Sequence, residues 1–402
     1  MSVSPGGAPA DNRTALVAQQ LDRLRAALAE APFDAYLAGS PANVAYATGY
    51  RSVAGELFRQ HQMAVLVTPD AVTLICPVAD AAPAVDAGVD LDAIVPFGRF
   101  YFETADADTV PAPTADLHAS LAEATQVAVT TRARGCRTLG VDVEGLGAAW
   151  PAMSAALPEG IGVQDAAGWA KQLRATKLPG EVELLRRAAR LAEEGIDRAI
   201  LKAGRGITER ELAAEVAQAM VAGGGAPRFV VVTSGPRSAL ADAAPSDRPL
   251  EPGDLLRFDV GCVLEGYWSD IGRTAVVGEP TALQQQRYDA ICAGEQAQLE
   301  RVRPGVTARE LFDLAVETVE AHGLRPYRRQ HCGHGIGSEV YEPPIIAPSF
   351  DTPLEPGMTF CFETPYYELG WGGMMVEDAL VVTDGGCRML TSSDRSLRVV
   401  SA

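Results

Sequence analysis

The sequence predicts an α+β protein in which an α/β domain precedes a second domain built from two related halves. Two observations predict this architecture. Helix-like and strand-like segments alternate over residues 14–170, which is typical of a compact α/β domain. Later in the chain, the same series of helix starts, turns and strands occurs twice. At about 150 residues per domain, the 402 residues suffice for two or three domains.

The first domain is predicted over residues 14–170, after a Pro/Gly-containing tail at residues 1–13 that we expect to be flexible. Apolar residues at helical spacing predict helices near residues 14–30, 114–126 and 148–156. Short apolar runs predict strands at residues 35–38, 43–48, 63–67, 72–76 and 138–141. The second domain, residues 171–402, begins just before a long helix predicted at residues 181–200. The first domain contains no motif that indicates chemistry.

The second domain contains an internal repeat. Residues 206–223 and 305–323 each begin with a Gly, and the Thr two positions later, Thr208 or Thr307, is followed after three residues by a Glu, the spacing of a capping box. Each opens an apolar-periodic helix that ends at a Gly. The run Leu-Glu-Pro-Gly occurs at residues 250–253 and again at residues 354–357, and each copy leads into an alternating strand. These matching features, in the same order, predict two α+β halves related by a pseudo-two-fold axis.

The repeat places acidic residues at equivalent positions in the two halves. Asp259 and Glu363 follow the two Leu-Glu-Pro-Gly turns at the same spacing, and Asp270 and Glu377 lie in the apolar strands that return. An isolated ionised carboxylate is costly to bury. Four converging carboxylates would repel one another unless cations neutralise them. The sequence therefore predicts divalent metal ions between these four side chains.

His334 supplies the fifth candidate ligand. It lies in the run HCGHGIG, where glycines on both sides leave the imidazole accessible. One imidazole with four carboxylates is an oxygen-rich donor set that suits Mn, Fe, Co or Zn better than copper. Two such ions, about 3.5–4 Å apart, would activate a bridging water and polarise a substrate carbonyl. Taken singly, a strand Asp is equally well explained as a turn or edge residue, and a lone His as a core residue.

Composition argues against several classes of function. A formal net charge of −18 argues against nucleic acid and anionic membranes as partners, because both are bound by clustered Lys and Arg. Seven cysteines without a C-x-x-C motif argue against a disulfide framework or a thiolate zinc site and favour a reducing cytoplasm. The first residues lack a basic and then apolar signal segment, and no apolar run of about 18 residues occurs. We therefore expect a cytoplasmic protein with no membrane partner.

The segments DVGCVLEGYWSDIGRT, HCGHGIG, FETPYYELG and VEDALVV resemble the pita-bread metallopeptidase superfamily, which includes methionine aminopeptidase, aminopeptidase P, prolidase and creatinase. NVAYATGY is similar to the N-terminal domain of creatinase and prolidase, and Arg174, Lys177 and Glu181 fit the entry into the catalytic domain. The resemblance implies a creatinase-like α/β domain followed by a pita-bread catalytic domain. It also implies an Xaa-Pro exopeptidase with two divalent metal ions (Mn first), a small peptide or small-molecule substrate, and a homodimer.

The resemblance further implies a role for each candidate ligand. Asp259 and Asp270 would bind one ion, and His334 and Glu363 the other. Asp270 and Glu377 would bridge the two ions. Glu363 would also act catalytically, as the proton acceptor for the bridging water.

The sequence departs from the family pattern at three positions. Asp242 and Tyr341 stand where the peptidases usually have histidines that contact the substrate or assist proton transfer, and Met375 stands where an Arg is often found. Only His331 and His322 are available within the catalytic domain as replacements. An anionic Asp242 could act as a base or pair with a cationic substrate group, and Tyr341 could donate a hydrogen bond to a developing oxyanion. A turn cap and plain packing explain these two residues equally well.

These departures leave two alternatives open. One is a specialised relative that hydrolyses or lyses a non-peptide metabolite, as creatinase, ectoine hydrolase and a sulfoniopropionate lyase do. The other is a metal-free binding module. In several of these families the N-terminal domain helps to close the partner's active site, and Tyr50, Arg51 and His61 are the candidates here for contact with a substrate. Arg51 could bind a carboxylate through two hydrogen bonds, although a solvated loop arginine explains it as well.

Overall fold

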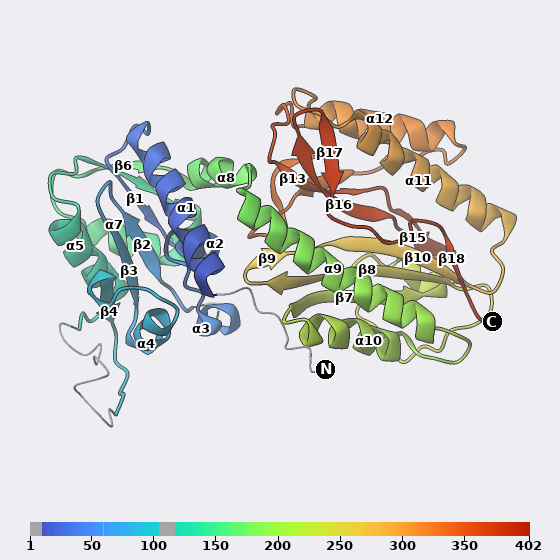
Figure 1. Ribbon diagram of the computed structural model, residues 1–402, viewed down its shortest axis with the longest axis horizontal. Helices are drawn as coiled ribbons and strands as arrows, with labels where there is room; N and C mark the ends of the chain where they lie inside the picture. Colours follow the sequence, from blue (N-terminus) through green and yellow to red (C-terminus); the bar gives the residue numbers. More distant parts are fainter. Residues whose placement is uncertain (1–9, 59, 104–116) are drawn as a thin grey trace. The chain divides into compact units, whose positions relative to one another are not determined.

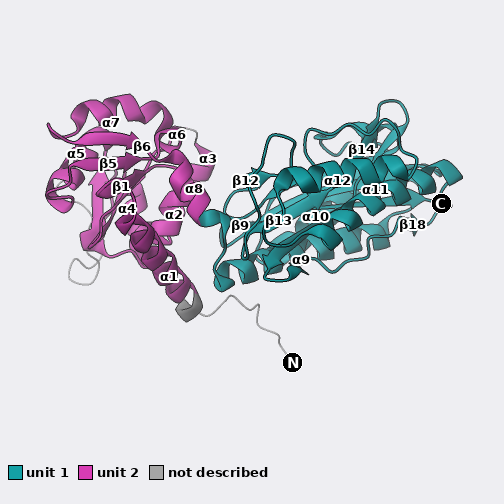
Figure 2. Cartoon of the chain, turned by 90° about the horizontal axis from the view of Figure 1, so that it is seen from above, with its two compact units in different colours: residues 1–5, 174–402 teal, residues 6–173 magenta. Residues whose placement is uncertain are grey.

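The computed structural model describes residues 10–58, 60–103 and 117–402. These residues form two compact units, which meet in the sequence after Leu173, inside helix α8 (Ala167–Ala175) (Figure 2). Among the described residues, no helix combines the length and the apolar character needed to cross a bilayer. The mixture of helices and sheets confirms the predicted α+β class.

The N-terminal unit contains one six-stranded sheet in the order β4-β3-β2-β1-β5-β6 (Figure 1). Its strands are β1 (Ala35–Ala38), β2 (Ala64–Val67), β3 (Val72–Pro77), β4 (Ile94–Phe97), β5 (Thr138–Val141) and β6 (Gly162–Asp165). Its other helices are α1 (Ala10–Ala29), α2 (Pro41–Thr48), α3 (Val53–Leu57), α4 (Val78–Asp86), α5 (Leu121–Arg132), α6 (Val143–Leu146) and α7 (Trp150–Ala156), with 3₁₀ turns η1 (Leu91–Ala93) and η2 (Gly147–Ala149). Because strand side chains alternate, Tyr36 and Leu37 of β1 belong to separate apolar cores, one containing α1 residues and the other α5 residues.

Most of the predicted elements of this unit are confirmed, but the strand predicted at residues 43–48 is wrong. That segment is helix α2. The Ser40 hydroxyl accepts a hydrogen bond from the Asn43 N–H, Pro41 occupies the first helical turn, and Gly49 ends the helix at φ 74°. These start and stop signals outweigh the strand preference of Val44 and Tyr46.

Two further boundaries differ from the prediction. Helix α1 begins at Ala10, so the end of the predicted flexible tail is helical, and residues 1–9 lie outside the described residues. The helix predicted near residues 114–126 is α5, which begins only at Leu121 after its cap Ser120. Part of that prediction lies outside the described residues.

The C-terminal unit contains a ten-stranded sheet with the path β12-β11-β13-β16-β10-β8-β7, to which β9, β17 and β18 add at the sides. Its main strands are β7 (Ala226–Ser234), β8 (Leu255–Leu264), β9 (Tyr267–Trp268), β10 (Ile271–Val277), β11 (Gly333–Gly335), β12 (Glu342–Ile345), β13 (Thr359–Glu363), β16 (Glu377–Thr383), β17 (Gly386–Met389) and β18 (Arg398–Val400). A separate hairpin contains β14 (Tyr366–Glu368) and β15 (Gly372–Met374). The helices are α9 (Pro179–Lys202), α10 (Glu209–Ala222), α11 (Ala282–Arg301) and α12 (Ala308–Ala321), and η3 (Gly235–Ala239) is a 3₁₀ turn.

The predicted repeat is visible in this topology. The order β8-β10 on one side of the sheet is mirrored by β13-β16 on the other, so the pseudo-two-fold axis passes between β10 and β16. Thr208 and Thr307 both form the predicted capping boxes of α10 and α12. They also make equivalent isolated bridges, to Pro249 and Pro353.

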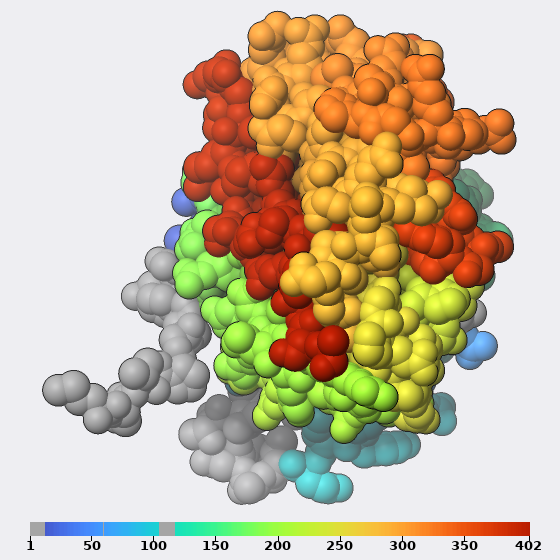
Figure 3. All heavy atoms as spheres, turned by 90° about the vertical axis from the view of Figure 1, so that its right-hand side faces the viewer, coloured from blue at the N-terminus to red at the C-terminus, as the bar shows by residue number. Residues whose placement is uncertain are grey.

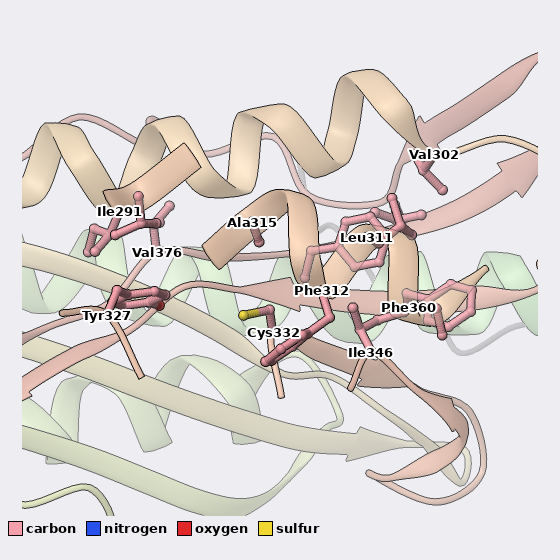
Figure 4. Packing of buried hydrophobic residues seen from close by; sticks show 14 of the residues in the cluster. Ile291, Val302, Leu311, Phe312, Ala315, Tyr327, Cys332, Ile346, Phe360 and Val376 are labelled. Carbon is pink, nitrogen blue, oxygen red and sulfur yellow. The ribbon is translucent and has the colours of Figure 1, made fainter. Parts of the chain in front are cut away.

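Each half has its own apolar core between its sheet strands and its helix pair. Residues of α9 and α10 pack with Phe258 and Val260 of β8, whereas residues of α11 and α12 pack with Phe360 and Phe362 of β13. Figure 4 shows Phe360 in this cluster with Leu311 and Phe312 of α12. The long helices approach their neighbours closely at repeat-related glycines, since a Cβ on Gly294 of α11 would lie 2.4 Å from the side chain of Val319. The helices thus cover one face of the sheet, and the opposite face is left for other side chains.

The C-terminal segment joins the two halves of this unit. Figure 3 shows it on the surface between residues of the first half, in green, and of the second half, in orange. The backbone N–H groups of Ser392 and Ser393 donate to Glu193 of α9. Arg395 lies 3.4 Å from Glu295 of α11, so both helix pairs are held by the same segment.

Candidate metal centre

One cross-strand row crosses the middle of the ten-stranded sheet and contains three of the predicted ligands. Asp259 on β8 pairs with Gly272 on β10, Gly272 pairs with Glu377 on β16, and Glu377 pairs with Glu363 on β13. Residues that face one another across strands project from the same face of the sheet. Asp270 precedes Gly272 by two positions and therefore projects from this face as well. The four acids thus converge on the face away from the helices.

His334 joins these acids from β11, where it pairs with Cys361 of β13. Its Nε2 lies 3.5 Å from Oδ2 of Asp270 and 3.9 Å from Oε1 of Glu377. Its Nδ1 lies 3.0 Å from the carbonyl oxygen of Gly335. A proton on Nδ1 satisfies that carbonyl and leaves the Nε2 lone pair directed at the acids, which is the arrangement of a metal-binding histidine.

The four acids fall into two kinds. The outer pair, Asp259 and Glu363, have cationic partners: Arg257 Nη1 lies 3.0 Å from Asp259, and Arg329 Nη2 lies 3.5 Å from Glu363. The inner pair, Asp270 and Glu377, have no ion pair with a Lys or Arg among the described residues. Asp270 Oδ1 and Glu377 Oε2 are also buried without a hydrogen-bond partner. An unpartnered buried carboxylate oxygen is costly, so these two atoms call for a ligand.

The pKa shifts separate Glu363 from the other three acids. Burial, followed by repulsion from Asp270, raises the pKa of Asp259 to about 7. Burial also raises the pKa of Asp270 and raises that of Glu377 well above its ordinary value. Burial acts in the same direction on Glu363, but a hydrogen bond from His331 and the nearby Arg329 hold its pKa below the usual range. Burial thus disfavours the charged forms of Asp259, Asp270 and Glu377, whereas the partners of Glu363 favour its ionised form.

The residues present fit a divalent metal ion. Ligand atoms of Asp270, His334 and Glu377 all lie within 4.8 Å of one another. They combine two hard carboxylates, each with an oxygen that has no other partner, and one imidazole nitrogen. This donor set is typical of Mn, Fe, Co or Zn sites. Asp259 and Glu363 flank the three-residue cluster in the same cross-strand row.

Tyr341 lies over this cluster. Its ring stacks on the His334 imidazole, with centroids 3.7 Å apart and an interplanar angle of 17°, and its edge-on contact with His331 has a centroid distance of 5.7 Å. The side chain is 48 % exposed. Partial burial, followed by the negative charge of Glu363 and its neighbours, raises the pKa of Tyr341. The phenol is thus a protonated donor at neutral pH.

Of the other predicted site residues of this unit, His331 contacts the acids and Asp242 lies in an exposed turn. His331 Nδ1 lies 2.9 Å from Glu363 Oε1, so this imidazole contacts a predicted ligand directly. Asp242 lies in an exposed turn directly after Ala241. The described contacts give its side chain no hydrogen bond or ion pair.

The N-terminal candidates belong to a hydrogen-bonded cluster inside their own unit. Tyr50 is 4 % exposed, and its hydroxyl donates to Asp80 at 2.7 Å. His61 Nε2 lies 2.8 Å from Asp80 and 3.2 Å from the Ser52 hydroxyl. Tyr50 therefore offers no free surface to a substrate, while Arg51 is half-buried at the start of α3.

Three residues beside the outer acids were not predicted from the sequence: Arg257, Arg329 and Tyr367. Arg257 and Arg329 pair with those acids, and both guanidinium groups lie over the ring of Tyr367, at 5.2 Å and 5.6 Å from its centroid. The direction of Arg257 could have been predicted, because a residue two positions before Asp259 in a strand projects from the same face of the sheet. Arg329 precedes β11 in an irregular segment, and no periodicity indicates its direction.

Comparison with known proteins agrees with this geometry. Residues 183–384 match the model of Metallopeptidase family M24, and residues 20–176 match the Creatinase/Prolidase N-terminal domain. The chain is 36 % identical over 229 residues to an Xaa-Pro dipeptidase of Pyrococcus furiosus, a match that covers 56 % of this chain and 66 % of the relative, just under two thirds. It is 28 % identical over 389 residues to an Xaa-Pro dipeptidase of Lactobacillus helveticus, covering 94 % and 98 % of the two chains.

Solved structures extend the likeness to both units. The Xaa-Pro dipeptidase of Bacillus anthracis superposes with a TM-score of 0.79 at 26 % identity, covering 96 % of this chain and 100 % of that one. Dipeptidase PepE of Mycobacterium ulcerans gives a TM-score of 0.78 at 28 % identity, covering 97 % and 99 %. The M24 match alone spans half of the sequence and contains every residue of the converging cluster. On this evidence the chain belongs to metallopeptidase family M24, a metal-dependent family.

Proposed function

We propose that this chain is an exopeptidase that holds two divalent metal ions and cleaves short Xaa-Pro peptides. The observation that carries the proposal is the pair of buried, unpartnered oxygens on Asp270 and Glu377, whose carboxylates lie 3.5–3.9 Å from Nε2 of His334. The names of the relatives, Xaa-Pro dipeptidases of Pyrococcus furiosus and Lactobacillus helveticus, support the substrate class.

The two ions are assigned to the five acidic and imidazole side chains. Asp259, Asp270, His334, Glu363 and Glu377 would together hold the two ions. Manganese is the first expectation, because four carboxylates and one imidazole form an oxygen-rich set. When bound, the ions supply Lewis acidity toward a peptide carbonyl and lower the pKa of water.

The protein's own side chains then act around the peptide bond. Glu363 accepts a proton from the water molecule that attacks the peptide carbonyl, since its lowered pKa keeps it ionised at neutral pH. His331, at 2.9 Å from Glu363, holds that carboxylate in place. The protonated Tyr341 hydroxyl is exposed enough to meet a substrate and donates a hydrogen bond to the developing oxyanion.

Metal analysis and a peptide panel test the proposal together. The full chain, purified after growth with added Mn, Fe, Co or Zn, is expected to contain about two ions per chain. It is expected to cleave Xaa-Pro dipeptides or tripeptides, to stop after chelation and to recover with Mn²⁺. A chain that binds no metal under any of these conditions, or that is fully loaded yet leaves every Xaa-Pro peptide intact, contradicts the proposal.

The site also favours one second candidate, an enzyme that hydrolyses or lyses a non-peptide small metabolite. The supporting observation is that Asp242 is exposed and Tyr341 covers His334, two positions at which the resemblance predicts histidines. Asp242→His separates the candidates. A rise in Xaa-Pro cleavage indicates a chain that has diverged from a peptidase, whereas a loaded variant that still cleaves no peptide favours the small-molecule reaction.

We also propose a cytoplasmic homodimer. All seven cysteines are free, which accords with a reducing compartment. Sedimentation velocity of the full chain is expected to give twice the chain mass of 42.3 kDa. A species at the mass of one chain, unchanged across concentrations, contradicts the dimer.

A further inference from the structure

The guanidinium of Arg257 is committed to four partners within the catalytic unit. Its side chain is fully buried. Nη1 lies 3.0 Å from Asp259 Oδ2, and Nε donates to the Ser238 carbonyl at 2.9 Å. Nη2 donates to the carbonyls of Leu240 and Ala241, at 2.9 Å and 2.6 Å. One side chain therefore joins a predicted metal ligand to the turn that leads to position 242.

A second arginine makes the corresponding contact in the other half. Arg329 pairs with Glu363, the repeat-related counterpart of Asp259. The two guanidinium groups share Tyr367, with centroid distances of 5.2 Å for Arg257 and 5.6 Å for Arg329. Such contacts between a guanidinium and an aromatic ring are attractive and gain strength where water is excluded. Each outer acid is thus paired with an arginine, and the two arginines are connected through the ring of Tyr367.

The position of the Arg257 guanidinium can also be reached from a different segment, the connection between β15 and β16. Its Nη1 lies 4.0 Å from the sulfur of Met375, and Met375 is 3 % exposed. Gly272 leaves room for a long side chain at residue 375, because a Cβ on residue 272 would lie 2.5 Å from Met375 Cγ. Met375 fills this space with apolar atoms, so the only guanidinium that the described structure places against Asp259 comes from β8.

We propose that Arg257 is a positioning residue that orients Asp259 for metal binding. In this chain the guanidinium comes from residue 257, and an arginine at residue 375 could supply it equally well. The inference rests on the metal site of the proposed function. Without Arg257, the Asp259 carboxylate is free to rotate and three carbonyls of the 238–241 turn lose their donor. Hydrogen-bond partners behind metal ligands typically change metal affinity by about 10–100-fold.

A transplant of the arginine tests this inference. Three forms of the full chain are compared: wild type, Arg257→Met, and the double variant Arg257→Met/Met375→Arg. Each is stripped with chelator and titrated with Mn²⁺ by calorimetry, and circular dichroism reports folding. The single variant is expected to bind one Mn²⁺ at least about tenfold more weakly, and the double variant to return within about threefold of wild type. Arg210→Met, which removes an exposed arginine paired with Asp247, is the control and is expected to match wild type.

The outcomes are decisive in each direction. An Arg257→Met chain that binds Mn²⁺ like wild type overturns the proposal, as does a folded double variant no better than the single one. If the single variant does not fold, the double variant decides: folding with near-wild-type affinity supports the transplant, and an unfolded double variant overturns it. Metal affinity is measured without substrate, so a wild-type chain that binds Mn²⁺ and cleaves no peptide sinks the proposed function alone.

Discussion

At the level of residues, the four acids of the site differ in whether they have a cationic partner in the protein. Asp270 and Glu377 lack a Lys or Arg partner in the described part of the chain, whereas Asp259 and Glu363 each have one. The inner acids therefore depend on an external cation for their charge balance. Replacing one of these acids should therefore stabilise the metal-free protein and destabilise the metal-bound protein relative to wild type.

Asp270→Asn tests this dependence. In the metal-free chain at pH 8, Asn removes a buried acid whose pKa is raised by burial, so the melting temperature is expected to rise by a few degrees. With excess Mn²⁺ the order is expected to reverse, because only wild type gains the full stabilisation from ligand binding. Thermal melts of both proteins with and without Mn²⁺ provide the measurement. A variant less stable in both conditions would show that Asp270 has a structural partner.

Tyr341→Phe tests the hydroxyl separately from the ring. Phe retains the stack on His334 but cannot donate a hydrogen bond. If the hydroxyl stabilises the oxyanion, kcat is expected to fall about 10²-fold with little change in KM. Steady-state kinetics on an Xaa-Pro dipeptide gives both constants. An unchanged kcat would reduce Tyr341 to a packing residue.

At the level of elements, the repeat is built on close approaches between neighbouring helices. A Cβ on Gly195 of α9 would lie 3.0 Å from the backbone oxygen of Val216, and one on Gly294 of α11 would lie 2.4 Å from the side chain of Val319. Each half therefore uses a glycine where its two helices are closest. These positions have to stay small although glycine is a poor helix former.

Gly294→Ala is accordingly expected to destabilise the protein. Alanine gains up to about 1 kcal/mol in helix propensity, but overpacking costs about 1–3 kcal/mol, so a net loss is expected in urea denaturation. Gly168→Ala in α8 is the matched control, because a Cβ there meets nothing within 4 Å. A gain in stability for both variants would indicate that α11 and α12 separate easily.

The same scale shows what could be read from the sequence. Capping boxes and Leu-Glu-Pro-Gly turns are local signals, and they predicted the repeat and the equivalent acids correctly because each half follows the same local rules. The segment containing Val44 and Tyr46 was assigned from residue preference, and the stronger signals at Ser40, Pro41 and Gly49 were overlooked. The partner of Glu363 could not be read at all, since Arg329 approaches through tertiary packing alone.

At the level of the whole catalytic unit, the segment that enters it is fixed to the second half of the repeat. The Lys177 N–H donates to the carbonyl of Gly357 at 2.8 Å. The Lys177 ammonium lies 2.6 Å from Glu342, and both side chains are buried. Arg174 lies 3.7 Å from the same carboxylate. Glu342 directly follows Tyr341, so this charged cluster also anchors the residue that covers His334.

Glu342→Gln is expected to be costly in a pH-dependent way. At pH 7 it leaves Lys177 and Arg174 without their buried counter-charge, a loss of roughly 3–5 kcal/mol. Burial alone would raise the pKa of Glu342, but Lys177 and Arg174 hold it below its ordinary value. The stabilisation is therefore complete above the unfolded pKa of about 4.3 and is lost as the pH falls through the lower folded pKa.

Urea denaturation of wild type and Glu342→Gln across pH provides the measurement. The difference in unfolding free energy is expected to stay constant from pH 8 to 6 and to shrink below pH 4. Glu339→Gln is the control, because Glu339 pairs with Arg174 but its side chain is 37 % exposed, and it should cost no more than about 1 kcal/mol. A Glu342→Gln penalty that is independent of pH would exclude an ionic origin.

Gly272 registers with Asp259 on one neighbouring strand and with Glu377 on the other. The separation between the ligands of the two halves is therefore dictated by backbone ladder geometry, in which adjacent strands lie about 4.8 Å apart. Loops around such a framework can change length and chemistry over evolutionary time without disturbing the distance between the ligand side chains. Diversification of substrate and reaction within this architecture should therefore arise in the loops at its rim.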